Sequence, residues 1–286
     1  MNVHKEEFTP RQFMQEKDFE FHHYLDRIPP NVEFHEHPFY EIFFFLSGNV
    51  NYIIEGRTYQ LRPGDILLTS SRDIHRPGIT PGKPYERYVI WMEDDFFARF
   101  QDWGDDLSAC FNDTARKKYQ LIRPDSSLLA RLKQHGAYMA QVKAEQHFGS
   151  RTLLYACLLE FLVYLNRAYF DTPDSIRHDI TENEKINQVV TYINDNLTEN
   201  LSLDRLASTF YISKYYLSNQ FKQYTGLTLY QFIMKKRLTV ARNMLRDGIP
   251  VTDACLRCGF NDYSNFLKAF KREFGHNPSD YIKHLQ

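Results

Sequence analysis

Two kinds of hydrophobic pattern divide the chain. Between residues 41 and 92, short apolar or aromatic runs alternate with turns that contain Gly or Pro, and the runs are 41–46, 51–54, 58–61, 66–68 and 85–92. Runs of this length between such turns are typical of β-strands. Several of them in succession predict a β-sandwich or barrel in the first third of the chain.

The pattern becomes helical after residue 100. A first series of apolar residues at helical spacing runs from Leu128 to Val142, and a second follows Gly149-Ser150. The second series forms a short apolar seam: Leu154, Leu158, Phe161, Leu165 and Ala168. Such a seam can join two helices. It would serve either packing on the barrel of its own chain or pairing of two chains, and the pattern does not separate these alternatives.

A polar stretch separates this half from the rest. Residues 171–181 contain Pro and lack hydrophobic periodicity, which favours two domains, residues 1–175 and 176–286. A chain of 286 residues with 43% hydrophobic residues is long enough to form two cores. The patterns together predict an α+β protein in which a β-barrel with a helical segment precedes an all-α domain.

Charge is distributed unevenly between the two parts. The net charge of the chain is −1, but residues 182–286 hold 14 Lys and Arg against 10 Asp and Glu, which leaves 21 against 26 for residues 1–181. A basic module attached to an acidic one indicates that only the C-terminal part meets a polyanion.

The chain shows no sign of export. We find no apolar run near the roughly 20 residues that span a bilayer, and residues 1–7 are too polar for a signal peptide. We therefore expect a cytoplasmic protein with no membrane partner. The few cysteines fit this expectation. Cys255 and Cys258 have the spacing of a metal or redox pair, but neither Cys110 nor Cys157 supplies a second pair, so we interpret both as core residues.

The C-terminal third repeats one design. Residues 203–226 and 251–275 each predict a short helix, a tight turn, and a longer helix with an apolar stripe and a polar, basic outer face. Ser202 and Ser213 are placed to cap the helices of the first unit, and Gly226 is placed to end it. A long helix, Leu229–Arg246, separates the two units. This is the helix-turn-helix pattern, present twice.

From about residue 184 onward the sequence resembles the DNA-binding domain of the AraC/XylS family, in which one helix bridges two helix-turn-helix units. The departures, Ala254-Cys255 and Tyr281-Ile282, are mild. The resemblance implies a transcription regulator that binds double-stranded promoter DNA, with RNA polymerase and a second copy of the chain (a homodimer) as further partners. The matching residues are Leu206, Ala207, Ser213, Leu217, Phe221, Lys222, Gly226, Arg237, Ala241, Leu245, Gly259, Phe260, Phe266, Phe270, Lys271, Gly275 and Pro278.

The resemblance places one recognition helix of each unit in the major groove of DNA. By family position, base readers would be Tyr215, Ser218, Asn219, Ser264 and Lys268. Lys222 and Lys271 would contact phosphate, although a solvated helix face is the alternative for each lysine singly. The outer faces of the two helices together offer Lys214, Tyr215, Ser218, Asn219, Lys222, Tyr263, Ser264, Asn265, Lys268 and Lys271.

A second candidate site lies in the strand-rich part. His35, His37 and Glu41 would share one face of a strand, and His75 follows a Pro-Gly-Asp turn. Three imidazoles and one carboxylate can hold Zn, Fe, Ni or Mn.

The spacing of these four residues resembles the two motifs of the cupin fold, a domain that many AraC/XylS members carry at the N-terminus. Pro29, Ser70 and Ile79 replace residues of those motifs. The alternative to a metal site is a polar pocket that binds a small-molecule effector without metal. Aromatic side chains would form its walls, or would simply fill the barrel: Phe39, Tyr40, Tyr52, Tyr88 and Trp91.

The sequence favours a transcription regulator controlled by an effector bound in the cupin-like barrel, with a carbohydrate or its derivative as the expected effector. The alternative is a metal-binding cupin, acting as a metal sensor or as a metal-dependent enzyme, fused to a DNA-binding domain. We find no general-base or nucleophile motif, so we do not expect an enzyme. No cofactor is required, and a divalent metal in the cupin pocket stays open.

Overall fold

The computed structural model describes residues 13–28, 30–112, 119–145, 147–172 and 174–285. The polar segment 1–7 and Pro29, both used above, lie outside these residues. The chain forms two compact units: one consists of Met1–Ile53 and Tyr59–Thr181, and the other of Ile54–Thr58 and Glu182–Gln286.

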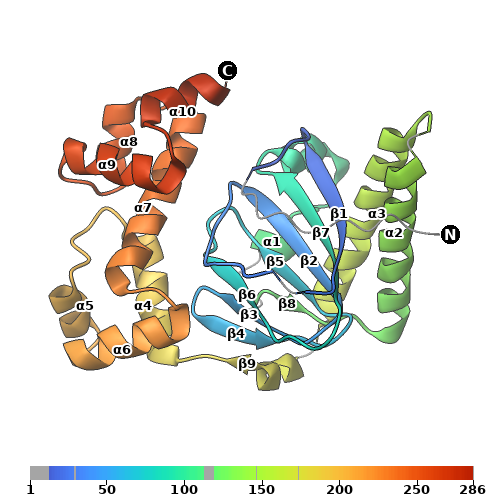
Figure 1. Ribbon diagram of the computed structural model, residues 1–286, viewed down its shortest axis with the longest axis horizontal. Helices are drawn as coiled ribbons and strands as arrows, with labels where there is room; N and C mark the ends of the chain where they lie inside the picture. The colour runs from blue at the N-terminus through green and yellow to red at the C-terminus, as the bar shows by residue number, and fades with distance from the viewer. Residues whose placement is uncertain (1–12, 29, 113–118, 146, 173, 286) are drawn as a thin grey trace. The chain divides into compact units, whose positions relative to one another are not determined.

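Two β-sheets form the centre of the N-terminal unit (Figure 1). The larger sheet has the strand order β1-β7-β2-β5-β8, and its neighbouring strands run antiparallel. The smaller sheet has the order β6-β3-β4-β9. The strands are β1 (Phe19–Asp26), β2 (Phe39–Ser47), β3 (Val50–Ile54), β4 (Arg57–Gln60), β5 (Ile66–Thr69), β6 (His75–Ile79), β7 (Tyr85–Glu93), β8 (Leu121–Ile122) and β9 (Ile180–Thr181).

The predicted β-domain is confirmed, and the five predicted runs correspond to β2, β3, β4, β5 and β7. Strand β1 was not predicted because its buried positions include polar residues. These residues find partners inside the unit: His22 Nε2 lies 2.9 Å from Glu20 Oε2, and His23 Nε2 lies 2.8 Å from Glu86 Oε1. Because these buried positions are polar, the sequence of β1 lacks the apolar pattern that indicates a strand.

Helices α2 (Ser126–Glu145) and α3 (Ser150–Asp171) lie side by side against the larger sheet (Figure 1). The shorter helices η1 (Phe96–Trp103) and α1 (Ala109–Asn112) precede them. The apolar seam of α3 packs into the core of its own chain, where Leu158, Phe161 and Leu165 are at most 1% exposed. This decides the packing alternative in favour of the chain's own barrel, and the homodimer stays a prediction that needs another surface.

Helix α3 is, among the described residues, the one helix that is long and apolar enough to cross a membrane. The sequence expectation that no stretch approaches this length and composition was therefore too strict. Length and composition alone are weak evidence, because a core helix of a globular domain meets the same criteria. The burial of one face of α3 in the core of its unit explains its apolar composition.

The polar stretch after α3 is structured. It contains η2 (Asp174–Asp179) and the short strand β9, which joins the smaller sheet beside β4. Arg123 donates two hydrogen bonds of 2.7 Å to the carboxylate of Asp65 and another to Asp179. Contacts with residues distant in sequence therefore hold this segment in place, and a local sequence pattern does not reveal such contacts.

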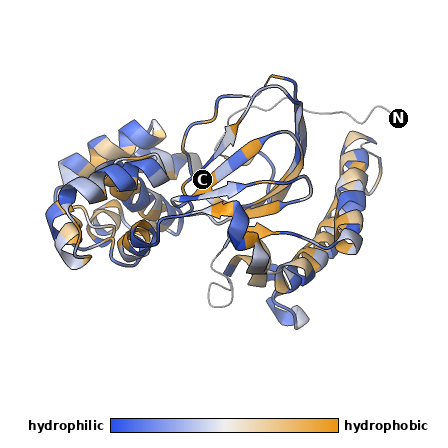
Figure 2. Ribbon diagram, turned by 90° about the horizontal axis from the view of Figure 1, so that it is seen from below, coloured by the Kyte–Doolittle hydropathy of each residue, from blue (hydrophilic) through white to orange (hydrophobic). Residues whose placement is uncertain are grey.

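The regular elements of residues 182–285 are all helices (Figures 1 and 2), and hydrophobic and hydrophilic residues alternate along them. Ser202 Oγ accepts a hydrogen bond of 3.3 Å from Arg205 N, and Ser213 Oγ accepts one of 3.1 Å from Tyr216 N, so both predicted caps are confirmed. The helices are α4 (Glu184–Asp195), α5 (Leu203–Thr209), α6 (Lys214–Thr225), α7 (Leu229–Arg246), α8 (Val251–Arg257), α9 (Tyr263–Phe274) and α10 (Pro278–Leu285).

Candidate functional site

The described part of the N-terminal unit holds a small cavity with a polar end. Its volume is about 40 Å³, which is room for about three water molecules. Side chains from the segment before β2 and from β2, β3, β6 and β7 line it: Val32, His35, His37, Glu41, Phe43, Tyr52, Pro77, Tyr85, Arg87, Val89 and Trp91.

Strand alternation explains which aromatic residues line the cavity. Alternate residues of β7, including Trp91, point inward, and so does Tyr52 of β3. Tyr88 belongs to the opposite face of β7, where it packs against Gly136 of α2, so the expectation that it walls the pocket is corrected. Tyr40 likewise contacts Phe97 on the helical side.

The expectation that His35 and His37 share one strand with Glu41 is also corrected. Only Glu41 lies in β2, because the strand begins after Pro38, which has no N–H to donate to a ladder. His35 pairs instead with His75 as an isolated bridge, with its backbone N 3.1 Å from the His75 carbonyl oxygen. The loop before β2 therefore brings the two histidines to the carboxylate from another direction.

The rings of His37 and His75 are held by the backbone. His37 Nδ1 lies 2.9 Å from the carbonyl oxygen of Phe39, and His75 Nδ1 lies 2.8 Å from that of Asp73. A carbonyl only accepts, so Nδ1 carries the proton in both rings. In the neutral form of either ring, the lone pair therefore lies on Nε2. Within the described residues both Nε2 atoms are buried and have no hydrogen-bond partner.

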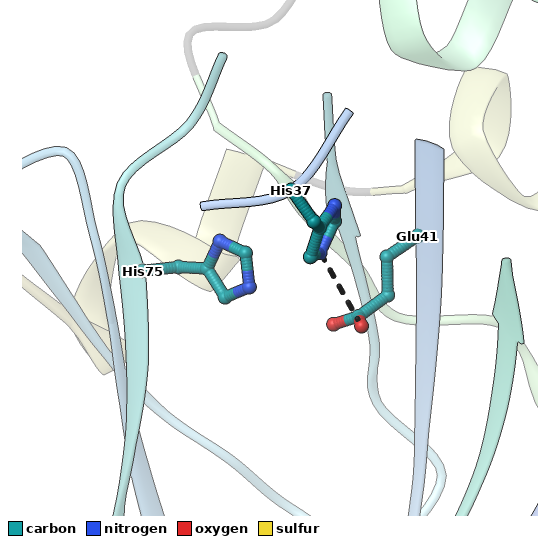
Figure 3. Close-up of side chains that lie close together, drawn as sticks. All are labelled: His37, Glu41 and His75. Carbon is teal, nitrogen blue, oxygen red and sulfur yellow. Dashed lines mark ion pairs between the residues drawn. The ribbon is translucent and has the colours of Figure 1, made fainter. Parts of the chain in front are cut away.

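Glu41 faces these two nitrogens (Figure 3). Its carboxylate accepts a 2.6 Å hydrogen bond from Trp91 Nε1 and a 3.4 Å one from the Tyr52 hydroxyl, and it lies 3.5 Å from His37 Nε2. Burial alone would raise the pKa of the Glu41 carboxyl. The nearby His37, His75 and the indole N–H outweigh burial and hold this pKa well below its usual range, so Glu41 is an anion.

His75 is the most enclosed of the three histidines, with no exposed surface. Burial first, and then the charges of His35 and His37, lower the pKa of His75 well below its usual range, so this imidazole is neutral. The ligand atoms of His37, Glu41 and His75 all lie within 4.8 Å of one another. His35 is not part of this group, and its ring packs edge-on against His75 with centroids 4.3 Å apart.

Six of the lining residues escaped the sequence-based prediction, and the polar ones among them are Arg87 and Tyr85. The Arg87 guanidinium is 2% exposed, pairs with Asp26, and lies over the Tyr85 ring at 4.0 Å. Side chains of a strand alternate between its two faces, so position 87 points to the same face as Trp91. This alternation could have predicted Arg87 from the sequence. The site thus combines a carboxylate anion, two bare imidazole nitrogens and a paired guanidinium. It offers acceptors for a cation or for a small polar ligand.

The second candidate site comprises α6 and α9. Leu217 and Phe221 of α6, and Phe266 and Phe270 of α9, are fully buried in the C-terminal unit. The ten residues that the sequence proposes for DNA are all exposed on the other sides of the two helices. Among them, Lys214 pairs with Asp204.

Cys255 and Cys258 are confirmed as core residues of the second helix-turn-helix unit. Burial raises the pKa of the Cys258 thiol to about 12. The Cys258 thiol lies 3.3 Å from the Cys255 carbonyl oxygen, and neither Cys110 nor Cys157 lies in this core.

Two short-helix, turn, long-helix units with exposed polar recognition faces, joined to a β-structured domain with an internal pocket, define a DNA-binding transcription regulator with a ligand-binding domain. The profile of the AraC-like ligand binding domain matches residues 24–162, and that of a helix-turn-helix domain matches residues 206–284. The chain belongs to the AraC family of transcription regulators.

Relatives match along most of their length. The HTH-type transcriptional activator RhaS of Escherichia coli O81 is 27% identical over 255 residues, which is 88% of each chain. RhaS of Salmonella typhimurium is 28% identical over 251 residues, or 86% of each. Among solved structures, an apo form of a ToxT point variant from Vibrio cholerae covers 95% of this chain and 99% of its own, with a TM-score of 0.42 and 14% identity.

Proposed function

We propose that this regulator activates transcription from promoters that it recognises through α6 and α9, and that occupancy of the cavity in its N-terminal unit controls this activity. The observation that carries the proposal is the pair of recognition helices, each with a buried apolar side and an exposed polar side. The name of the RhaS relatives, transcriptional activators, supports activation over repression. Activation implies RNA polymerase as a partner, and we propose a cytoplasmic homodimer.

In this proposal the base readers are Tyr215, Ser218 and Asn219 of α6, and Ser264 and Lys268 of α9. Asn pairs with adenine and Ser with several bases, whereas Lys takes guanine or phosphate. Lys222 and Lys271 lie one helical turn further along and contact phosphate. The first helix offers no Arg to read guanine, so its base discrimination is softer than that of an Arg contact.

The proposed effector site is the cavity around Glu41. A carbohydrate was the expected effector, but pockets for drug-sized ligands hold about 300–1,000 Å³, and this cavity holds about 40 Å³. A sugar would therefore require side chains such as Tyr52 or Trp91 to move. An occupant the size of an ion with its water needs no such movement, which favours the metal-sensing alternative over the sugar-binding one.

DNA selection tests the function. Duplexes bound by the full-length protein are enriched from a random library, and affinity for the winning duplex is measured by fluorescence anisotropy. Ser218→Ala and Ser264→Ala should each weaken binding, by roughly 5–150-fold for a lost base contact worth about 1–3 kcal/mol. Lys283→Ala, on the exposed side of α10, is the matched control. Unchanged affinity in both serine variants would contradict the assigned reading faces, and failure to enrich any duplex would contradict the function.

A further inference from the structure

The strongest unexplained feature of the molecule is the pair of unpartnered histidine nitrogens near the Glu41 carboxylate. Among the described residues, His37 Nε2 and His75 Nε2 are buried and lack a hydrogen-bond partner. A buried acceptor left unsatisfied costs about 1–3 kcal/mol, and here two such acceptors face one carboxylate. Three electron-pair donors that converge in a closed space repel one another unless a cation lies between them.

Protonation of one histidine is the simplest alternative, and it explains only part of the geometry. A protonated His37 would donate Nε2–H to Glu41, but the two atoms are 3.5 Å apart, whereas charge-assisted hydrogen bonds are about 2.7–2.9 Å long. It would also leave His75 Nε2 without a partner, because no donor among the described residues reaches that atom.

We propose that His37 Nε2, His75 Nε2 and a carboxylate oxygen of Glu41 bind one divalent transition-metal ion. This inference rests on the proposed function, because it names the class of ligand that occupies the regulatory cavity.

The donor set selects the class of ion. Two imidazoles with one carboxylate suit Zn²⁺, Fe²⁺, Mn²⁺ or Ni²⁺, whereas Ca²⁺ and Mg²⁺ take oxygen ligands. The ligand atoms lie within 4.8 Å of one another. Metal–ligand distances of about 2.0–2.2 Å place tetrahedral ligands about 3.4 Å apart, so the side chains close on the ion by small rotations.

The surroundings have the features of a supporting shell. Metal-binding histidines usually donate their other ring N–H to a carbonyl or carboxylate, which fixes the tautomer. The carbonyls of Phe39 and Asp73 accept those bonds here. The Trp91 indole N–H orients the carboxylate of Glu41. The whole cavity of about 40 Å³ is of a size for an ion together with bound water.

His35 is excluded from the ligand set, which separates this site from the four-residue set suggested by the sequence. Its ligand atoms do not join the group formed by the other three residues. Its Nδ1 bonds to the carbonyl of Glu33, and its ring packs on the edge of His75. His35 is therefore a positioning residue, and a three-ligand site with open positions results.

The test measures metal content directly. Full-length protein is stripped with EDTA, dialysed against Zn²⁺, Mn²⁺, Ni²⁺ or, without oxygen, Fe²⁺, and bound metal is counted by mass spectrometry. Wild type should bind a single equivalent of at least one of these ions. His75→Gln and Glu41→Gln should each lose more than the roughly 10–100-fold in affinity that a lost supporting residue costs. The absorption of bound Co²⁺ gives a second readout of the ligand set.

One histidine variant serves as a control, and a second tests the ligand set. His135→Gln, in α2 beside Glu160, should keep the full equivalent, whereas His35→Gln should lose no more than the roughly 10–100-fold in affinity that a lost supporting residue costs. A loss in His35→Gln as large as that in His75→Gln, with retained Trp fluorescence, would contradict the three-ligand assignment. A wild-type protein that binds less than about a tenth of an equivalent of every ion tested would overturn the site.

DNA binding keeps the two proposals separate. If the protein binds no metal but enriches a specific duplex, the metal site is refuted and the regulator stands. If it binds metal at His37 and His75 but enriches no duplex, the proposed function fails and the metal site stands.

Discussion

Replacement of Gly259 by alanine should destabilise the C-terminal unit more than the same change at Gly275. Both glycines have a positive φ, +89° and +78°. At Gly275 an added Cβ meets nothing within 4 Å, whereas at Gly259 it would lie 2.3 Å from the carbonyl oxygen of Leu197 and 2.9 Å from Arg237 Nε. Arg237 donates to that same oxygen at 2.9 Å, so the methyl group enters an existing hydrogen bond.

The magnitude follows from two contributions. The left-handed conformation costs an alanine about 1–2 kcal/mol at either position. Only Gly259→Ala adds the cost of forcing atoms into a packed region, about 1–3 kcal/mol. One kcal/mol shifts the melting temperature of a domain of roughly 100 residues by about 4–8 °C. Gly259→Ala should therefore melt at least about 4 °C below Gly275→Ala.

Circular dichroism at the helical wavelength reports the unfolding of the C-terminal helices together with that of α2 and α3. Both tryptophans, Trp91 and Trp103, lie in the N-terminal unit, so their fluorescence follows that unit alone. Equal melting temperatures for the two variants would refute the close approach of Gly259, in the turn of the second helix-turn-helix unit, to the Leu197 carbonyl.

Three further predictions concern DNA contact, thiol reactivity and pH. Lys222→Ala should weaken DNA binding about equally on all sequences and reduce the salt slope of the affinity by about one unit, as measured by anisotropy at several salt concentrations; an unchanged slope would remove Lys222 from the phosphate contacts. The native protein should react slowly with iodoacetamide at pH 8, because all four cysteines are buried and burial raises the pKa of the Cys258 thiol to about 12; rapid labelling of Cys258 before unfolding would contradict its place in the core. Burial tends to raise the pKa of the Asp18 carboxyl, but hydrogen bonds from Tyr155 and Arg99 outweigh burial and lower this pKa. The unfolded state therefore binds the proton more readily than the folded state. The stability that Asp18 contributes is present above about pH 4 and is lost as the pH falls further. In Asp18→Asn, the melting temperature followed by Trp fluorescence should therefore fall less steeply as pH decreases below about 4. An unchanged dependence of melting temperature on pH would show that the Asp18 carboxylate contributes nothing.

The helical third could be predicted almost residue by residue. Its signals are local: Ser202 and Ser213 cap helices next to them in sequence, and the bridging helix spans Leu229–Arg246 as the pattern predicts. The exposed sides of α6 and α9 follow from the same period, because apolar residues at helical spacing leave the other side in solvent.

The barrel could be predicted only in outline, because its decisive contacts join distant residues. His23 and Asp26 are buried in β1, and their partners Glu86 and Arg87 belong to β7, which no local sequence rule indicates. The candidate site shows the same limit. Sequence spacing proposed His35 as an equal of His37, and only the fold separates the two, since Pro38 starts the strand late and the loop turns His35 toward His75.

Hydroxyl-radical footprinting tests the central claim, that one chain reads DNA through both α6 and α9. On a selected duplex the wild-type protein should protect two backbone segments on one face, about one helical turn apart. Asn219→Ala should weaken protection of one segment and Lys268→Ala that of the other. A single protected segment, or a footprint unchanged by both substitutions, would contradict the claim.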